Sequence, residues 1–327
     1  MSKKVGIPKA LLYYNFYPAW KVFFNELGAE VITSGNTCKK IIDDGVKSCV
    51  DEACLPVKVF VGHVIDLKEK GVDYIFIPRI VSIEPKKYLC AKFLGLPDMV
   101  KCLVPDLPEI IDTKIDLYKN DKSLMREIVR TGKKFVSDKA KIYMGYYKAL
   151  EMQNKFEGIM KMGFSPNEAI KSLEGEDVKV INNGNLKIAL LAHSYDIMDD
   201  YICMGIVDRL REMGAFVYTI EMIEKNKIEM GVRKLPKDSF WTYGHDILGA
   251  GQYFLDNKNV DGVITVSAFG CGPDSLIEDL LERYYKRDGK IPFMSLTIDE
   301  HTGEAGILTR LEAFMDLLRW KKGEIVI

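Results

Sequence analysis

The stretch 263–274, VITVSAFGCGPD, joins an apolar run rich in β-branched residues to the start of a helical pattern. The apolar run predicts a strand buried on both faces, as in parallel α/β sheets. Cys271 follows between two glycines, which permit a tight turn and a close approach of the backbone to a ligand, and Pro273 suits the first turn of a helix. Because ligands of open α/β sheets bind outside the carboxyl ends of the strands, this cysteine lies where a site is expected.

Strand and helix patterns alternate along most of the chain, in two series separated by a polar helical stretch from about 121 to 173. In the first series we expect strands at 5–8, 29–33 and 72–78 and helices at 18–27, 37–50 and 56–70. In the second we expect strands at 186–192, 215–220, 262–268 and 291–297, and helices at 199–213, at 305–320 and one ending near 255.

This alternation predicts an α/β fold with two doubly wound parallel sheets, facing each other across a central cleft and joined by a helical segment. We expect the first lobe over 1–118, the connecting segment over 119–183 and the second lobe over 184–327. The sequence NNGN at 182–185 is the clearest linker-like break.

The charge of the chain is balanced, with 46 Lys and Arg against 47 Asp and Glu in 327 residues. This balance gives no electrostatic case for nucleic acid or an anionic membrane as the main partner. We also find no apolar stretch of transmembrane length and no cleavable leader at the start, and we expect a cytoplasmic protein.

Seven cysteines, an odd number without regular spacing, occur in a chain too large to need disulfide staples. In a reducing compartment they are core residues, nucleophiles or metal ligands. Apolar residues lie at helical spacing from Cys203, Cys49 and Cys102, so we expect these three cysteines in the core. For Cys38, a structural and a functional role both stay open. Three others are expected in loops or at helix starts: Cys54, Cys90 and Cys271.

By themselves, these three thiols fit an iron–sulfur cluster, a cysteine nucleophile with a histidine partner, or no shared site. A zinc site normally contains a close pair such as C-x-x-C, which the chain lacks. A cluster held by three thiolates would leave one iron open for another ligand.

Four motifs add a resemblance: VDEACLPVK at 50–58, YLCAKFLGLPD at 88–98, FGCGPD at 269–274 and DEHTGE at 299–304. Together and in this order, they resemble the acyl-CoA dehydratase activase-related proteins. These are similar to the iron–sulfur subunits of 2-hydroxyacyl-CoA dehydratases and benzoyl-CoA reductases. The match runs through both α/β halves and is weakest in the helical middle.

The resemblance implies two flavodoxin-like lobes and one [4Fe–4S] cluster whose ligands would be Cys54, Cys90 and Cys271. It also implies an ATP-dependent activator protein that supplies a low-potential electron, and a CoA thioester as the electron's acceptor. A non-catalytic electron carrier with the same cluster is the first alternative, and a cluster-free thiol or zinc enzyme is the second. The chain has no G-x-x-x-x-G-K-[ST] loop, so it does not resemble the ATPase itself. The relatives work as two related subunits, and a homodimer stays open here.

Three further residues are candidates for proton transfer or as neighbours of the cluster. His301 and Glu304 follow the last predicted strand, where the alternative is that Thr302 and Glu304 simply begin the closing helix. His193 also follows a predicted strand, with a bond to loop backbone as its alternative. For His63, in the middle of a predicted helix, we expect a structural role.

Overall fold

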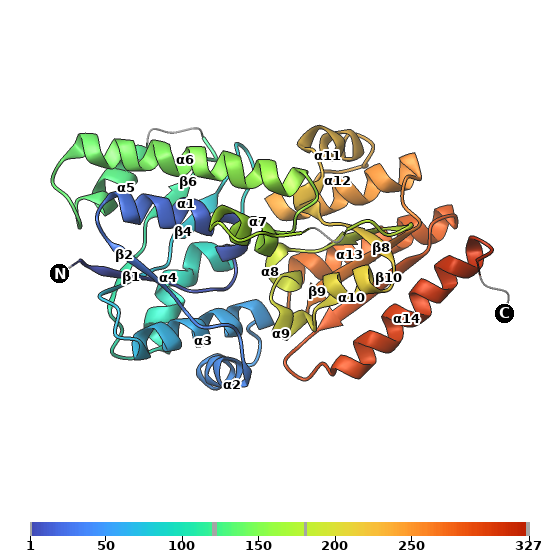
Figure 1. Cartoon of the computed structure of the whole chain (residues 1–327), viewed down its shortest axis with the longest axis horizontal. Coiled ribbons are helices and arrows are strands. Elements are labelled where there is room, and N and C mark those ends of the chain that lie inside the picture. The colour runs from blue at the N-terminus through green and yellow to red at the C-terminus, as the bar shows by residue number, and fades with distance from the viewer. Residues whose placement is uncertain (1, 120–122, 180–181, 325–327) are drawn as a thin grey trace. The chain divides into compact units, whose positions relative to one another are not determined.

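The computed structural model describes residues 2–119, 123–179 and 182–324 (Figure 1). The chain folds into two compact units. Unit 1 comprises Met1–Gly158 together with Phe240–Thr242, and unit 2 comprises Ile159–Ser239 and Tyr243–Ile327. A short piece of the later sequence therefore belongs to the first unit.

Unit 1 contains a four-stranded parallel sheet in the order β2-β1-β3-β5. Its strands are β1 (Lys4–Ile7), β2 (Glu30–Thr33), β3 (Tyr74–Phe76) and β5 (Glu109–Ile111). Side chains alternate between the two faces of the sheet. Phe76 packs against Phe24 of helix α1 (Tyr13–Glu26), whereas on β1 a Cβ at Gly6 would meet Leu67 of α3 (Leu55–Glu69) at 3.1 Å. Helices therefore cover both faces.

The remaining elements of unit 1 surround this sheet. Strands β4 (Arg79–Ser82) and β6 (Lys114–Asp116) pair in parallel as a separate two-stranded sheet. Helix α2 (Lys39–Ser48) crosses α3 closely, and α4 (Ala91–Leu103) packs on β4. Helix α5 (Ser123–Gly132) packs on β6, and the long α6 (Lys139–Lys161) lies along α1 in Figure 1.

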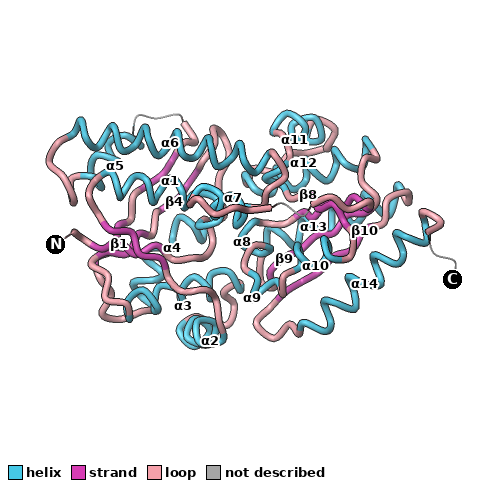
Figure 2. The backbone as a smooth tube through the Cα atoms, viewed as in Figure 1, coloured by secondary structure: helices cyan, strands magenta, loops and turns pink. Residues whose placement is uncertain are grey.

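Unit 2 contains a second four-stranded parallel sheet, in the order β10-β9-β7-β8. Its strands are β7 (Leu186–Leu191), β8 (Ala215–Tyr218), β9 (Gly262–Ala268) and β10 (Phe293–Ile298). Every residue of β9 is buried, as expected for a central strand covered on both faces. Figure 2 shows the strands enclosed by helices.

Two groups of helices enclose the sheet of unit 2. Helices α11 (Lys225–Val232), α12 (Thr242–Asn257) and α13 (Gly272–Asp288) share one apolar core with β7 and β9. Helix α10 (Ile206–Glu212) packs on β8. Helix α14 (Glu304–Lys321) packs on β9, where a Cβ at Gly262 would meet the ring of Phe314 at 2.9 Å.

The two sheets have the same topology. When the strands of each main sheet are numbered in chain order, both sheets read 2-1-3-4, which is the start of the flavodoxin-like order 2-1-3-4-5. The chain order reverses between β1 and β3 in unit 1 and between β7 and β9 in unit 2. The predicted α/β class with flavodoxin-like parallel sheets is therefore confirmed, and each sheet has one switch point of the kind that binds ligands.

The helical middle of the chain is distributed over both units. Helix α5 and nearly all of α6 belong to unit 1, and α7 (Pro166–Leu173) belongs to unit 2. Helix α7 is anchored there by Arg211, whose guanidinium donates to Glu168 at 2.8 Å. The domain boundaries expected from the sequence, 1–118, 119–183 and 184–327, stay a prediction about independently folding parts.

Two helices differ from their predicted extents. The first was expected to begin at Pro18 but begins at Tyr13, with Pro18 inside it. The helix expected over 199–213 is split into α9 (Asp200–Cys203) and α10, because Met204 and Gly205 both adopt left-handed backbone conformations. No helix among the described residues is both long and apolar enough to cross a membrane.

The contact between α2 and α3 requires glycine and positions the start of α3. A Cβ at Gly62 would lie 1.9 Å from the Ile41 carbonyl oxygen of α2. We predict that Gly62→Ala lowers the free energy of unfolding by about 1–3 kcal/mol, because the two helices must separate. Gly95→Ala in α4, where a Cβ meets nothing within 4 Å, is the matched control and is expected to be neutral or stabilising. Urea unfolding measures both, and equal stabilities would contradict this account.

Candidate functional site

The turn after β9 presents Cys271 at the start of α13. Gly270 has a φ of +80°, a left-handed conformation that favours glycine, and Cys271 is the N-cap residue of α13. Pro273 lies in the first turn of α13. Backbone N–H groups in a first turn have no acceptor within the helix, so the missing N–H of proline costs no hydrogen bond there. The local structure expected from the sequence is thus observed, with the thiol half-buried at a helix N-terminus.

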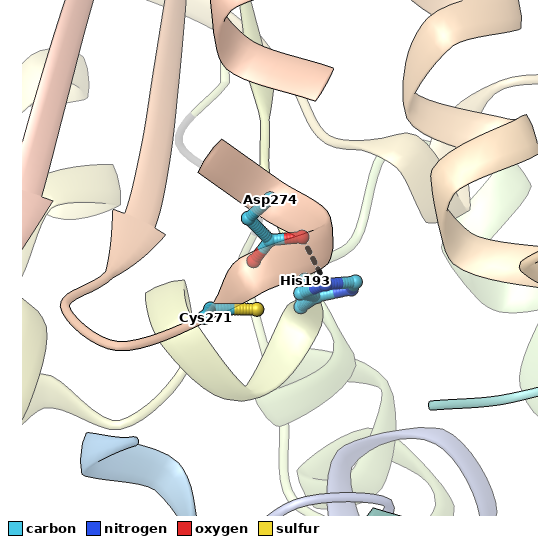
Figure 3. A group of neighbouring side chains, drawn as sticks. All are labelled: His193, Cys271 and Asp274. Carbon is cyan, nitrogen blue, oxygen red and sulfur yellow. Dashed lines mark hydrogen bonds and ion pairs between the residues drawn. The ribbon is translucent and has the colours of Figure 1, made fainter. Parts of the chain in front are cut away.

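His193 lies beside this cysteine, at the exit of the neighbouring strand β7. It is the N-cap residue of the short helix α8 (Ser194–Ile197), and its Nε2 hydrogen-bonds Asp274 Oδ1 at 2.8 Å. Its ring stacks on Tyr195 and meets Tyr243 edge-on, with centroid distances of 4.8 and 5.3 Å. The Cys271 thiol points toward the imidazole (Figure 3). The pair β7 and β9 is the switch point of this sheet, so the group lies where α/β ligands bind.

Further carboxyl groups are buried around this pair. Asp196 is completely buried, and neither of its oxygens has a hydrogen-bond partner among the described residues. Asp274 Oδ2, Glu221 Oε2 and His193 Nδ1 are also buried without a described partner. Buried polar atoms normally find partners, and buried charges are normally compensated. Several acids around one imidazole would therefore leave an excess of negative charge in the interior of unit 2 if all of them were ionised.

Burial and the neighbouring acids shift the pKa values of His193, Asp196 and Cys271. Burial alone would lower the pKa of His193, but the charge and hydrogen bond of Asp274, aided by Asp196 and Glu221, raise it overall. Burial and the Asp274 charge raise the pKa of Asp196 well above its usual range, against an opposing effect of His193. Burial, followed by the charge of Asp274, likewise raises the pKa of the Cys271 thiol. These shifts favour forms in which protons or a cation neutralise the site.

The donor atoms of His193, Cys271 and Asp274 form a group that could hold a metal ion, because all of them lie within 4.8 Å of one another. An imidazole nitrogen, a thiolate and a carboxylate oxygen suit zinc or iron. A bound cation would also offset the buried negative charge and lower the pKa of the thiol.

Cys54 and Cys90 belong to unit 1, and both are N-cap residues of long helices. Cys54 caps α3 and Cys90 caps α4, and neither cap has a side-chain hydrogen bond to its helix. Cys54 is buried with Ala53 and Val57, whereas Cys90 is half-buried. The expectation that these cysteines lie at helix starts is thereby met. That Cys54 and Cys90 bind one cluster together with Cys271 stays a prediction.

The other cysteines match their predicted environments unevenly. Cys203 is buried, with its Sγ 3.4 Å from the Ile197 carbonyl oxygen, and burial raises its pKa to about 12. Cys49 is only half-buried, and Cys102 is exposed, so the core position predicted for Cys102 was wrong. It lies in the last turn of α4, on a side of the helix that faces solvent. Cys38 is exposed as the N-cap residue of α2.

His301 and Glu304 lie on the surface of unit 2. The His301 amide donates to Asp299 Oδ1 at 2.9 Å, and Thr302 Oγ1 donates to the same carboxylate at 2.7 Å. Glu304, the first residue of α14, forms an ion pair with Arg209 of α10. The structure therefore groups His193 with Cys271 but does not place His301 or Glu304 in that buried group, and their catalytic roles stay predictions.

Two other histidines have structural partners. His63 is completely buried, and its two ring nitrogens lie 2.8 Å from Ser34 Oγ and 2.9 Å from Thr37 Oγ1, so its expected structural role is confirmed. Burial lowers its pKa to about 4. His245 hydrogen-bonds both Asp238, at 2.7 Å, and Glu229, at 3.0 Å. These contacts join α11 and α12.

The acids of the site were not among the functional residues predicted from the sequence. Asp274 belongs to the motif FGCGPD, and Asp196 follows His193 by three residues. Both therefore lie shortly after a predicted strand, which could have marked them as candidate site residues. Glu221 had no such signal, because it comes from the short 3₁₀ helix Ile220–Met222 after β8, and only the fold brings it near. Its carboxylate accepts a hydrogen bond from Ser194.

Residues 4–223 match the protein-family model described as the CoA enzyme activase uncharacterised domain (DUF2229). This range covers all of the main sheet of unit 1 and extends past β8 of unit 2. The comparison with curated proteins found no match. The resemblance inferred from the four cysteine- and histidine-containing motifs is confirmed at the level of this family.

Asp196 should make the stability of the metal-free protein depend on pH. Its carboxyl stays protonated in the folded state above the pKa of about 3.9 that it has when unfolded, so stability falls as the pH rises from there toward the folded pKa. An asparagine side chain at this position cannot ionise and escapes this loss. We predict that Asp196→Asn stabilises the protein relative to wild type more at pH 7 than at pH 4.

Urea unfolding at both pH values measures this difference. Asp177→Asn, at an exposed carboxylate of unit 2, serves as the control for a surface change of the same chemistry. A stability difference for Asp196→Asn that is the same at both pH values would show that the carboxyl ionises normally in the folded protein.

Proposed function

The chain belongs to the CoA enzyme activase uncharacterised domain family, and on that premise we propose that it binds a [4Fe–4S] cluster through Cys54, Cys90 and Cys271. The proposed cluster takes a low-potential electron from an ATP-dependent activator protein and delivers it to a CoA thioester. Free thiols are kept reduced in the cytoplasm, so we propose that the protein is located there.

One observation carries this proposal: each of the three cysteines is the N-cap residue of a helix at least 13 residues long. Ser, Thr, Asp and Asn are the residues preferred at that position, because their oxygens accept hydrogen bonds from the first turn. Cysteine is not among them, and at Cys271 a hydrogen bond from the backbone amide of Asp274, in the first turn of α13, acts to lower the thiol pKa against the effect of burial. The positive end of each helix instead favours a thiolate, which is the form that binds iron.

The surroundings of Cys271 also favour a cation over a free nucleophile. A cysteine nucleophile needs a lowered pKa, whereas burial and Asp274 raise the pKa of this thiol. Metal binding reverses this effect, since a coordinating thiol is deprotonated by the ion. The donor set therefore fits a metal centre better than it fits metal-free thiol catalysis.

His193 has a defined part in this proposal. Asp274 accepts a hydrogen bond from its Nε2 and so orients the ring, while Nδ1 has no partner among the described residues. Nδ1 is then available to ligate the iron that three cysteines leave open, or to hold a proton for the reacting group. When bound, the cluster supplies one-electron transfer at low potential, and the protein supplies positioning, exclusion of water and this proton.

A second candidate function follows from the compact group of His193, Cys271 and Asp274. Their donor atoms already lie within 4.8 Å of one another, so a single zinc ion could bind there without Cys54 or Cys90. Metal analysis separates the two functions. Zinc at about one per chain in colourless protein would favour this second candidate over the cluster.

The cluster assignment predicts the metal content of four variants purified without oxygen. Wild type should contain about four irons and four sulfides per chain with a broad absorption band near ~400 nm. Cys54→Ala, Cys90→Ala and Cys271→Ala should each lose nearly all of this iron. Cys203→Ala should retain it, because Cys203 is a core residue bonded to Ile197. Equal iron in all four variants would refute the ligand set.

A CoA thioester separates an enzyme from an electron carrier with the same cluster. If the thioester reaches the open iron, adding it should shift the absorption and electron paramagnetic resonance spectra of the reduced protein. We expect His193→Ala to alter that shift and Glu312→Gln, at an exposed position of α14, to leave it unchanged. A spectrum unaffected by thioesters of varied acyl groups, in protein that still accepts electrons from an activator, would assign the carrier function.

A further inference from the structure

A cavity of about 330 Å³ opens on unit 1. Its volume is at the lower end of the range of ligand-binding pockets. Its walls come from the β4–β6 sheet, the loop before α4 and the first residue of α5. The lining residues are Val81, Tyr88, Lys114, Asp116, Tyr118, Lys119 and Ser123.

Two tyrosines form an aromatic wall of the cavity. The rings of Tyr88 and Tyr118 stack with their centroids 4.4 Å apart and their planes 12° from parallel. Tyr88 is still 39% exposed, so the stack is not covered by other side chains. An aromatic surface of this kind stacks on flat rings, which contributes about 1–3 kcal/mol per nucleic-acid base.

The backbone holds both tyrosines in place. Tyr88 exchanges hydrogen bonds with the segment that returns to unit 1 late in the sequence, donating to the Phe240 carbonyl and accepting from the Thr242 amide, each at 2.8 Å. Tyr118 donates its amide to Asp116 Oδ1 at 3.3 Å and accepts from the Lys86 amide at 3.1 Å. The aromatic wall is therefore preorganised, which reduces the entropy lost on binding.

Two lysines provide positive charge at the same cavity. Lys114 Nζ lies 3.2 Å from Asp116 Oδ2 and is half-exposed, and the Lys119 side chain is exposed. The lining residues thus carry one net positive charge, and Ser123 adds a hydroxyl donor. Lysine binds phosphate as a point charge, and the Asp116 carboxylate can accept from a ring amine or a sugar hydroxyl.

We propose that this cavity binds a nucleoside phosphate, with the base on the stacked tyrosines and the phosphate at Lys114 and Lys119. An inorganic anion would leave the aromatic wall unused, and an apolar ligand would make no use of the lysines or of Asp116. Free nucleotides and the nucleotide end of a coenzyme share this chemistry. None of the lining residues is a proposed cluster ligand, but Tyr88 lies two residues before Cys90, so binding is to be measured both with and without iron.

Isothermal titration of the full chain, with and without iron, tests the proposal using ADP as the probe. We expect ADP to bind both forms, and Lys119→Ala to weaken ADP binding about tenfold by loss of one charged phosphate contact. Lys119→Arg should retain most of the affinity. Lys101→Ala, at an exposed lysine of α4 outside the lining, should leave it unchanged.

Tyr118→Leu tests the stacking contribution, and we expect it to weaken ADP binding about tenfold. The exposed Lys119 variants keep the proposal testable if Tyr118→Leu does not fold. Coenzyme A binding at least tenfold more tightly than ADP, with the same loss in Lys119→Ala, would identify a coenzyme as the source of the nucleotide, and equal affinities would identify a free nucleotide.

Three results would overturn the proposal. The first is no binding of ADP at millimolar concentration. The second is inorganic phosphate or adenosine alone binding as tightly as ADP, because either would show that one half of the cavity is not used. The third is ADP affinity that neither Lys119→Ala nor Tyr118→Leu changes.

Discussion

The buried hydrogen bond between His193 and Asp274 determines the chemistry of unit 2. It lies at the exits of β7 and β9, where the strand order reverses, and it holds the imidazole beside the Cys271 thiol. Asp196 and Glu221 add further carboxyl groups in the same interior. Buried charge that side chains do not compensate is costly, so this group depends on protons or a cation. That requirement is the physical basis on which metal binding is proposed for this group.

The same parallel arrangement that creates the switch points also creates helix starts. In a β-α-β sequence, each helix begins on the side where the preceding strand ends. Cys90 and Cys271 follow β4 and β9 in this way, and Cys54 begins the helix that leads into β3. The positive end of a helix dipole at a thiol favours its ionised form, the thiolate. The repeated topology of the two units thus offers thiol sites of one physical kind.

Much of the fold could be predicted from periodicity, because long apolar strands and amphipathic helices have strong local patterns. Strand β9 was predicted with its observed bounds, and the glycine-flanked turn to Cys271 was expected from the same stretch. Strands β4, β5 and β6 were not expected. Each has only three or four residues, too few for a period of two to stand out, and their pairing depends on partners far along the chain.

The sequence by itself determined the α/β class, the family resemblance and the thiols at strand exits and helix starts, because these depend on residues close together in the chain. Only the tertiary structure decided that His193, Cys271, Asp274 and Asp196 share one buried environment, since strand pairing over about 70 residues joins β7 to β9. It also decided that His301 and Glu304 lie at the surface and that Cys102 is exposed. Burial and charge compensation are properties of the assembled core, and no local pattern encodes them.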